Sequence, residues 1–255
     1  MGRVLAAIDA SPCARPVVQT ALSVADFFEA SVVALHVREK GSDLALEAAH
    51  AAGVELLEIT GSPIEGIITA AEDPRVVAVV LGARGVHGGP HPAGHAALEV
   101  ITRVNKPVVV VQPDGTTRAR IGRVLIPLEG TDESSQAIAD TIALARRHDI
   151  EVLVLHVHAP ETVPAFEDQP HHEVPAWEGE FVARFVSVPH AHVDLIQRVG
   201  VAADRIVAVA GDAEADLIAL GWNQNLAPGR AQVVREALTH STIPVLLVPT
   251  PLPGG

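Results

Sequence analysis

The sequence contains an internal repeat, and this repeat limits the possible fold more than any other feature. The segment RVLAAIDASP at residues 3–12 returns as RVLIPLEGTD at residues 123–132. SVVALHV at residues 31–37 returns as EVLVLHV at residues 151–157, at the same offset of 120 residues. Two matches at one offset indicate a repeated folding unit and not a short shared motif.

The later part of each repeat matches at a larger offset. Residues 60–82 align without gaps with residues 199–221 at an offset of 139, and NKPVVVVQP at 105–113 corresponds to TIPVLLVPT at 242–250. The offset grows from 120 to 139, so the second copy carries 19 additional residues between residue 157 and residue 199. Because the matches occur in the same order, we interpret the chain as two homologous units.

A polar stretch, QPDGTTRAR at residues 112–120, separates the two units. We expect a first domain at 1–113, a linker at 114–122 and a second domain at 123–255, with the insertion at about 159–192.

Within each unit, short apolar runs alternate with helical patterns. VLAAI is a continuous apolar run, as expected of a strand that is covered on both faces. Ser11 followed by Pro12 predicts a helix start, and Gly61, Ser62 and Pro63 predict another. Such alternation predicts an α/β fold with a parallel sheet and helices on both faces. Ligands of these sheets bind beyond the carboxyl ends of the strands, here near Asp9 and after the fourth strand.

Composition and charge exclude several classes of partner. The chain has 255 residues with 48% hydrophobic and only 3% aromatic residues, so its cores must be aliphatic. A formal charge of -13 disfavours binding to nucleic acid or to anionic membranes. The opening MGRVLAAIDASP predicts neither a signal peptide nor a membrane span, and Cys13, the single cysteine, fits a reducing compartment. We expect a soluble cytoplasmic protein.

The motifs VLAAIDASP, VVALHV, GSPIEGIITAA, VVLGARG and KPVVVVQP resemble the universal stress protein family, and their counterparts in the second unit do so again. This resemblance covers nearly the whole chain outside about 159–190. It implies two tandem Rossmann-like domains, each with a five-stranded parallel sheet of order 3-2-1-4-5. It also implies that the two units pair through their last strands within one chain.

Nucleotide-binding members of that family resemble one another in three places. These are an acidic residue after the first strand, a small apolar residue ending the second, and G-x-x-G-x9-G-[ST] after the fourth. Asp9 matches the first position and Val37 the second, while Gly82 and Gly85 match the start of the loop with Arg84 between them. Glycines of this kind allow backbone N–H groups to approach phosphates.

The second half of the loop departs from the family pattern. Gly94 follows Gly85 after eight residues instead of nine, and His95 stands where Ser or Thr is expected. Loss of the hydroxyl contact costs roughly 1.5–3 kcal/mol, about one to two decades in affinity. The resemblance implies ATP or a related adenine nucleotide, with Mg²⁺ accompanying it, bound weakly in the first unit. A loop without a nucleotide is the alternative.

The second unit matches the nucleotide pattern less well. Glu129 replaces the aspartate, and Gln224 stands at the position of the second glycine, although Gly221 and Gly229 are kept. Arg230 occupies the Ser/Thr position. We expect no nucleotide of the usual kind there.

Histidines raise the question of a metal site. His87, His91 and His95 recur every fourth residue, but the glycines and prolines among them forbid a helix that would align the rings. We therefore interpret them as loop histidines, assign no metal site, and keep a metal as the alternative. His36 and His156 occupy the same place in the two units, which favours a structural role.

The insertion is proline-rich at first, and from Trp177 onward Phe181, Val182 and Phe185 recur at helical spacing. This helix either packs on its own unit, covers the cleft, or meets a partner.

No Ser-His-Asp elbow, Walker loop or CxxC pair is present, so we expect no dedicated enzyme and at most weak nucleotide hydrolysis. The leading hypothesis is a cytoplasmic stress-response or regulatory protein that binds an adenine nucleotide through its first domain. The alternative is a protein-interaction scaffold that binds no nucleotide and uses the insertion in the second domain. A homodimer and an unidentified protein partner are left open by the sequence.

Overall fold

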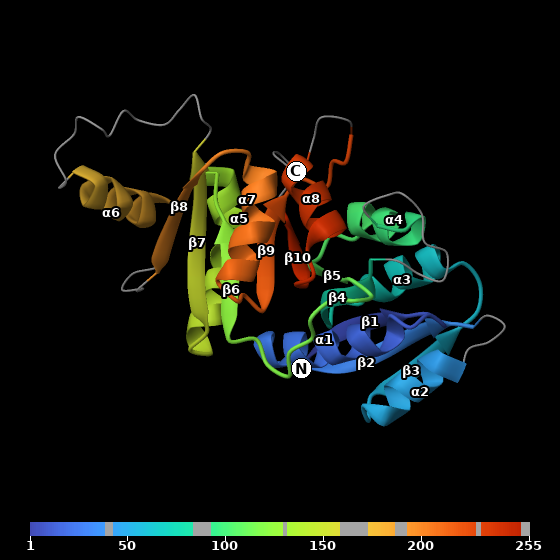
Figure 1. Cartoon of the computed structure of the whole chain (residues 1–255). Coiled ribbons are helices and arrows are strands. Elements are labelled where there is room, and N and C mark those ends of the chain that lie inside the picture. Colours follow the sequence, from blue (N-terminus) through green and yellow to red (C-terminus); the bar gives the residue numbers. More distant parts are fainter. Residues whose placement is uncertain are drawn as a thin grey trace.

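A computed structural model describes residues 1–38, 43–83, 93–129, 132–158, 173–186, 193–227 and 231–250. Within these ranges strands and helices alternate along both repeats (Figure 1). The first repeat contains β1 (Gly2–Ile8), α1 (Ala14–Phe27), β2 (Ala30–Val37), α2 (Asp43–Ala51), β3 (Glu55–Ile59), α3 (Pro63–Ala71), β4 (Val76–Gly82), α4 (His95–Arg103) and β5 (Val108–Val111).

The second repeat follows the same order of elements. It contains β6 (Arg123–Pro127), α5 (Asp132–Arg147), β7 (Glu151–His158), α6 (Glu173–Phe185), β8 (Asp194–Val199), α7 (Ala202–Asp212), β9 (Leu217–Trp222), α8 (Gln232–His240) and β10 (Val245–Pro249). The insertion thus lengthens the β7–α6–β8 connection, which corresponds to β2–α2–β3 of the first repeat.

The described strands form one ten-stranded sheet of order β3-β2-β1-β4-β5-β10-β9-β6-β7-β8. Each half of this sheet has the expected order 3-2-1-4-5, and neighbouring strands within each half are parallel. The halves join through the antiparallel pair β5–β10, where Val110 lies opposite Val245. The predicted fold class is confirmed. Because the joining pair is antiparallel, the strands of the two halves run in opposite directions, and their carboxyl ends lie at opposite ends of the strands of the sheet.

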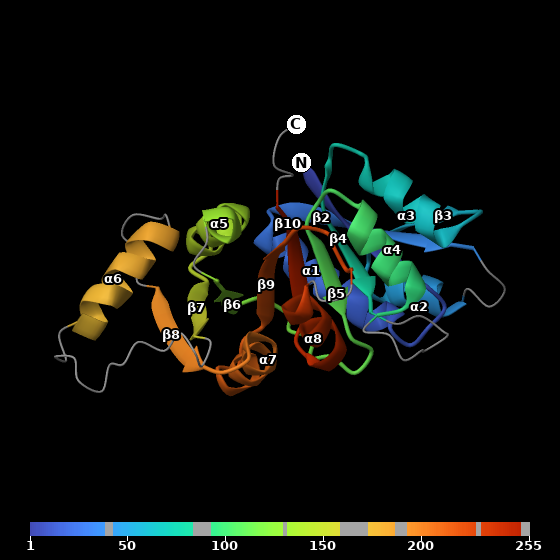
Figure 2. The same cartoon turned by 90° about the horizontal axis from the view of Figure 1, so that it is seen from above.

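Helices cover both faces of the sheet, as Figure 2 shows from above. One apolar layer packs α1, α2, α5 and α6 against the side chains of one face, including Val4, Ala34 and Val154. The other layer packs α3, α4, α7 and α8 against side chains such as Leu5 and Ile218. Both layers are almost entirely aliphatic, as the composition requires.

The segment between the repeats is fixed to both of them. Thr116 N donates to Thr242 O at 2.7 Å in the second repeat, and Thr117 Oγ1 donates to Gln19 Oε1 at 3.1 Å in α1. Gly122 N donates to Asp216 Oδ2 at 2.8 Å. The linker is therefore part of the packed structure.

Three helix starts test the sequence predictions. α3 begins at Pro63 with Ser62 before it, as predicted. α1 begins at Ala14 and not at Pro12, since a turn closed by Ala14 N donating to Ser11 O at 3.1 Å precedes it. α6 begins at Glu173, four residues before the predicted start.

Candidate functional site

The carboxyl end of β1 lies where the strand order reverses, between β1 and β4. Asp9 follows β1 directly and is half-buried. Its Oδ1 accepts hydrogen bonds from Ser11 N at 3.1 Å and from Ser11 Oγ at 2.5 Å. No described residue donates to the other carboxylate oxygen. Local bonds thus hold one carboxylate oxygen, and no other described residue competes with a ligand for the second.

A backbone hydrogen bond joins the residue that follows β4 to the residue that precedes α4. Ala83 N donates to Val111 O at 2.7 Å, and Gly94 N donates to Ala83 O at 2.6 Å. Gly94 is the extended N-cap of α4, and no side chain of the described residues caps the N-terminus of this helix. The first N–H groups of α4 therefore lie beside the end of β4, in the arrangement that binds anions in α/β proteins.

The predicted site residues are placed to different degrees. Gly82 ends β4 opposite Val111 of β5, and His95 is the exposed first residue of α4. Val37 ends β2 and is buried, and its side chain lies close to Gly66 of α3. Arg84 and Gly85 lie outside the described residues, as do His87 and His91. The structure brings Gly82 and the α4 N-terminus together at the switch point next to Asp9.

Cys13 lies behind this edge and is closed to solvent. Its Sγ contacts Val111 O at 3.7 Å, and the residue is 2% exposed. Burial raises the pKa of the Cys13 thiol to about 12, with smaller contributions from Asp9 and Asp114. The thiol is therefore protonated at neutral pH and serves as a buried side chain.

The second unit places different side chains at the equivalent positions. Glu129 is exposed after β6. Gln224 has a left-handed backbone with φ of 56°, and its Nε2 donates to Val104 O of the first unit at 2.9 Å. Sequence reasoning noted the glutamine but missed this contact. Gly229 and Arg230 lie outside the described residues.

Comparison with known proteins identifies this doubled architecture. A family model described as the universal stress protein family matches residues 120–249, slightly more than half of the chain. The chain belongs to the universal stress protein family. The model matches the second unit, although the first unit keeps more of the loop pattern.

Solved structures agree with this assignment at the level of the fold. A universal stress protein from Archaeoglobus fulgidus DSM 4304 superposes with a TM-score of 0.65 at 17% identity, covering 97% of this chain and 96% of that one. A protein of unknown function from Pseudomonas aeruginosa PAO1 gives 0.65 at 14% identity, covering 97% and 92%. No curated protein matches the sequence. Both likenesses span the two units together.

The paired histidines of this universal stress protein fold make equivalent contacts. His36 Nδ1 lies 3.0 Å from Ile8 O, and His156 Nδ1 lies 2.9 Å from Leu128 O. The His36 ring therefore bonds the last carbonyl of β1, and the His156 ring bonds the carbonyl directly after β6. Burial lowers the pKa of His156, which keeps the ring neutral. These contacts support a structural role.

The described part of the insertion packs on its own unit. Phe181 of α6 is buried, and its ring centre lies 4.8 Å from that of His156. Gln197 of β8 donates to Glu178 Oε1 at 2.7 Å and pairs with His158 at 2.9 Å. This part of α6 thus contacts β7 through Phe181 and β8 through Glu178.

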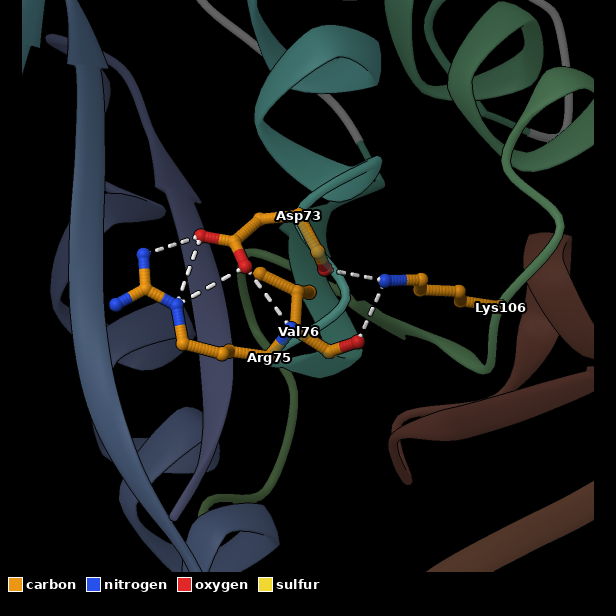
Figure 3. Close-up of polar contacts among 4 residues, drawn as sticks. All are labelled: Asp73, Arg75, Val76 and Lys106. Atoms are coloured by element: carbon orange, nitrogen blue, oxygen red, sulfur yellow. Dashed lines mark hydrogen bonds and ion pairs between the residues drawn. The ribbon is translucent and has the colours of Figure 1, made fainter.

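A second polar cluster lies at the opposite, amino end of β4 and β5 (Figure 3). Lys106 Nζ donates to Asp73 O at 2.6 Å and to Val76 O at 2.7 Å. Hydrogen bonds from the Arg75 side chain and then from its backbone hold the pKa of Asp73 well below its usual range. The cluster joins α3, β4 and β5 and lies away from the candidate site, so we assign it a structural role.

No helix within the described ranges combines the length and the apolar character that crossing a membrane requires.

Proposed function

We propose that the protein is a cytoplasmic stress-response or regulatory protein that binds ATP or a related adenine nucleotide in its first unit. The observation that carries this proposal is the bond from Gly94 N to Ala83 O at 2.6 Å. It sets the N-terminus of α4, which no described side chain caps, at the switch point of the sheet, next to a carboxylate whose Oδ2 receives no hydrogen bond from the described residues. N–H donors that bind an anion lie here beside a carboxylate that accepts hydrogen bonds from hydroxyl groups. This combination suits a nucleotide, which carries both phosphates and a ribose.

Each residue has a distinct part in this proposal. Asp9 accepts hydrogen bonds from the ribose hydroxyls, and Val37 supplies an apolar wall. Gly82 and Gly85 let the backbone approach the phosphates, and Arg84 adds positive charge.

At the far end of the loop, the N–H groups that follow Gly94 bind the phosphates, and His95 replaces the hydroxyl of the family pattern. Mg²⁺ would accompany the nucleotide and neutralise part of its charge. The missing hydroxyl makes binding weaker by about one to two decades in affinity.

We also propose the domain limits 1–113 and 123–255, with the linker at 114–122. The bonds from Thr116 to Thr242 and from Gly122 to Asp216 support a linker that is packed against the second unit. The scaffold alternative stays a hypothesis, because Phe181 and Val186 of the insertion are buried and do not offer an exposed apolar surface.

Isothermal titration of the full chain with ATP and Mg²⁺ tests the function. Asp9→Asn removes a charged acceptor and should weaken binding about tenfold or more. Glu129→Gln makes the equivalent change in the second unit and should leave the affinity unchanged. Absence of heat from the unaltered protein at millimolar ATP would refute nucleotide binding, and equal losses in both variants would refute the assignment to the first unit.

A further inference from the structure

Gln224 reaches from the second unit to the end of a first-unit helix. Its Nε2 donates to Val104 O at 2.9 Å and lies 3.4 Å from both Ile101 O and Thr102 O. Ile101 O and Thr102 O belong to the last turn of α4, where backbone carbonyls have no partner within the helix, and Val104 is the C-cap residue that follows it. Since all three neighbours are acceptors, only the amide nitrogen fits there.

The backbone conformation of Gln224 is itself energetically unfavourable. Its φ of 56° is left-handed, a conformation that residues with a Cβ adopt rarely. The position corresponds to Gly85 of the first unit, where a glycine would adopt it freely. A glutamine in a glycine conformation indicates that its side chain compensates for the strain, and the cap on α4 is the contact that it makes.

The capped helix is the one whose other end forms the candidate site. α4 has nine residues, so its ends are about 13 Å apart. Ala97, Val100 and Ile101 anchor one side of it in the apolar layer. Near its C-terminus the buried Val104 also packs in this layer, and the ion pair between Arg103 and Glu65 is exposed and contributes little. The cap from Gln224 therefore fixes the last turn, and with it the direction in which the first N–H groups point.

We propose that Gln224 is a positioning residue for the nucleotide site of the first unit. The second unit's loop acts on that site by holding α4 and makes no contact with the ligand. This inference rests on the proposed function, but the state of α4 can be measured without a nucleotide.

Hydrogen exchange of the ligand-free full chain measures the cap directly. Gln224→Ala should raise the exchange of amides in residues 95–104 about fivefold, as expected for one lost hydrogen bond. Gln224→Gly relieves the backbone but also lacks the amide, so its exchange should rise as well. Gln112→Ala is the matched control, because Gln112 Nε2 donates to Leu238 O of α8. That variant should raise exchange in residues 232–241 and leave α4 unchanged. Normal exchange of α4 in Gln224→Gly would overturn the proposal.

Nucleotide titration separates positioning from general stability. Gln224→Ala and Gln224→Gly should both weaken ATP binding about two- to fivefold, although the glycine variant is the more stable of the two. Gln112→Ala should bind like the unaltered chain. An unchanged ATP affinity in both Gln224 variants, beside a loss in Asp9→Asn, would overturn positioning and leave the nucleotide site standing. If the unaltered chain binds no nucleotide, the proposed function fails and positioning of a nucleotide site fails with it, while the exchange data still report on the cap.

Gln224→Glu adds a test with a pH signature. The ionised carboxylate would face three carbonyl oxygens and the negative end of the α4 dipole, so the folded protein should raise the pKa of this glutamate. The exchange defect should be present at neutral pH and should shrink as pH falls through that raised pKa, because the protonated acid can donate to Val104 O. The same defect at every pH would contradict a cap made by a donor at this position.

Discussion

Replacing Lys106 with methionine should destabilise the first unit measurably. The ammonium donates to two carbonyls, Asp73 O at 2.6 Å and Val76 O at 2.7 Å, where α3 ends and β4 begins. Methionine keeps an apolar side chain of similar length, so the change removes the donor with little loss of packing. In the second unit the corresponding position is Ile243, and the chain there has no equivalent ammonium.

The magnitude follows from two opposing effects. Each hydrogen bond from a charged donor contributes about 1.5–3 kcal/mol, which gives an upper limit of about 6 kcal/mol for the pair. Burial lowers the pKa of Lys106, which shows that the charge is partly desolvated at a cost. The residue is still partly exposed, so water replaces much of what is lost. We expect a loss of about 1–2 kcal/mol in the free energy of unfolding.

Urea unfolding followed by circular dichroism measures this loss. In a chain of this size, 1–2 kcal/mol corresponds to a decrease in Tm of about 2–8 °C. Arg103→Met is the control, since it breaks the exposed pair with Glu65 and should cost no more than about 1 kcal/mol. If Lys106→Met costs no more than Arg103→Met, then water satisfies the two carbonyls as well as the ammonium does, and the reasoning is refuted.

Two further predictions concern the thiol and the glycines. Burial raises the pKa of Cys13 to about 12, so the stability that the neutral thiol contributes is fully present below the unfolded-state pKa of about 9. This contribution should be lost as the pH rises from about 9 toward 12. Urea unfolding at alkaline pH should show the loss in the unaltered protein and not in Cys13→Ser. Gly200 has φ of +137° and lies against Arg205, so Gly200→Ala should lower the free energy of unfolding by about 1–3 kcal/mol. Gly211, within α7 and with open space around it, offers the contrast, and Gly211→Ala should stabilise by about 0.5–1 kcal/mol in the same assay.

The sheet could be predicted because its signals are local and repeated. Continuous apolar runs such as VLAAI define strands buried on both faces, and the repeat shows which run corresponds to which. The order of the strands came from the family resemblance, and the structure confirms it. Helix starts depended on finer balances, since a turn from Ser11 to Ala14 precedes α1, which begins two residues after the predicted Pro12.

The candidate site was predicted only in part. Asp9 and Gly94 follow their strands in sequence, so strand order alone places them at one edge. Gln224 could not be assigned its role, because its partner Val104 is 120 residues away and belongs to the other unit. The one available signal was a non-glycine residue at a glycine position. Such a residue indicates an altered loop, but the sequence does not show what the side chain touches.

A tandem chain can use one loop position in two ways. In a symmetric dimer of identical units, any residue placed at an interface also appears at the equivalent place in the partner. A glutamine that capped the neighbouring helix would then replace the second glycine in both ligand loops. Here Gly85 and Gln224 stand at equivalent positions on one chain, so the first unit keeps its glycine while the second supplies the cap. A change of Gly85 to glutamine should therefore impair nucleotide binding without adding a useful contact, whereas glycine at 224 should impair it by releasing α4.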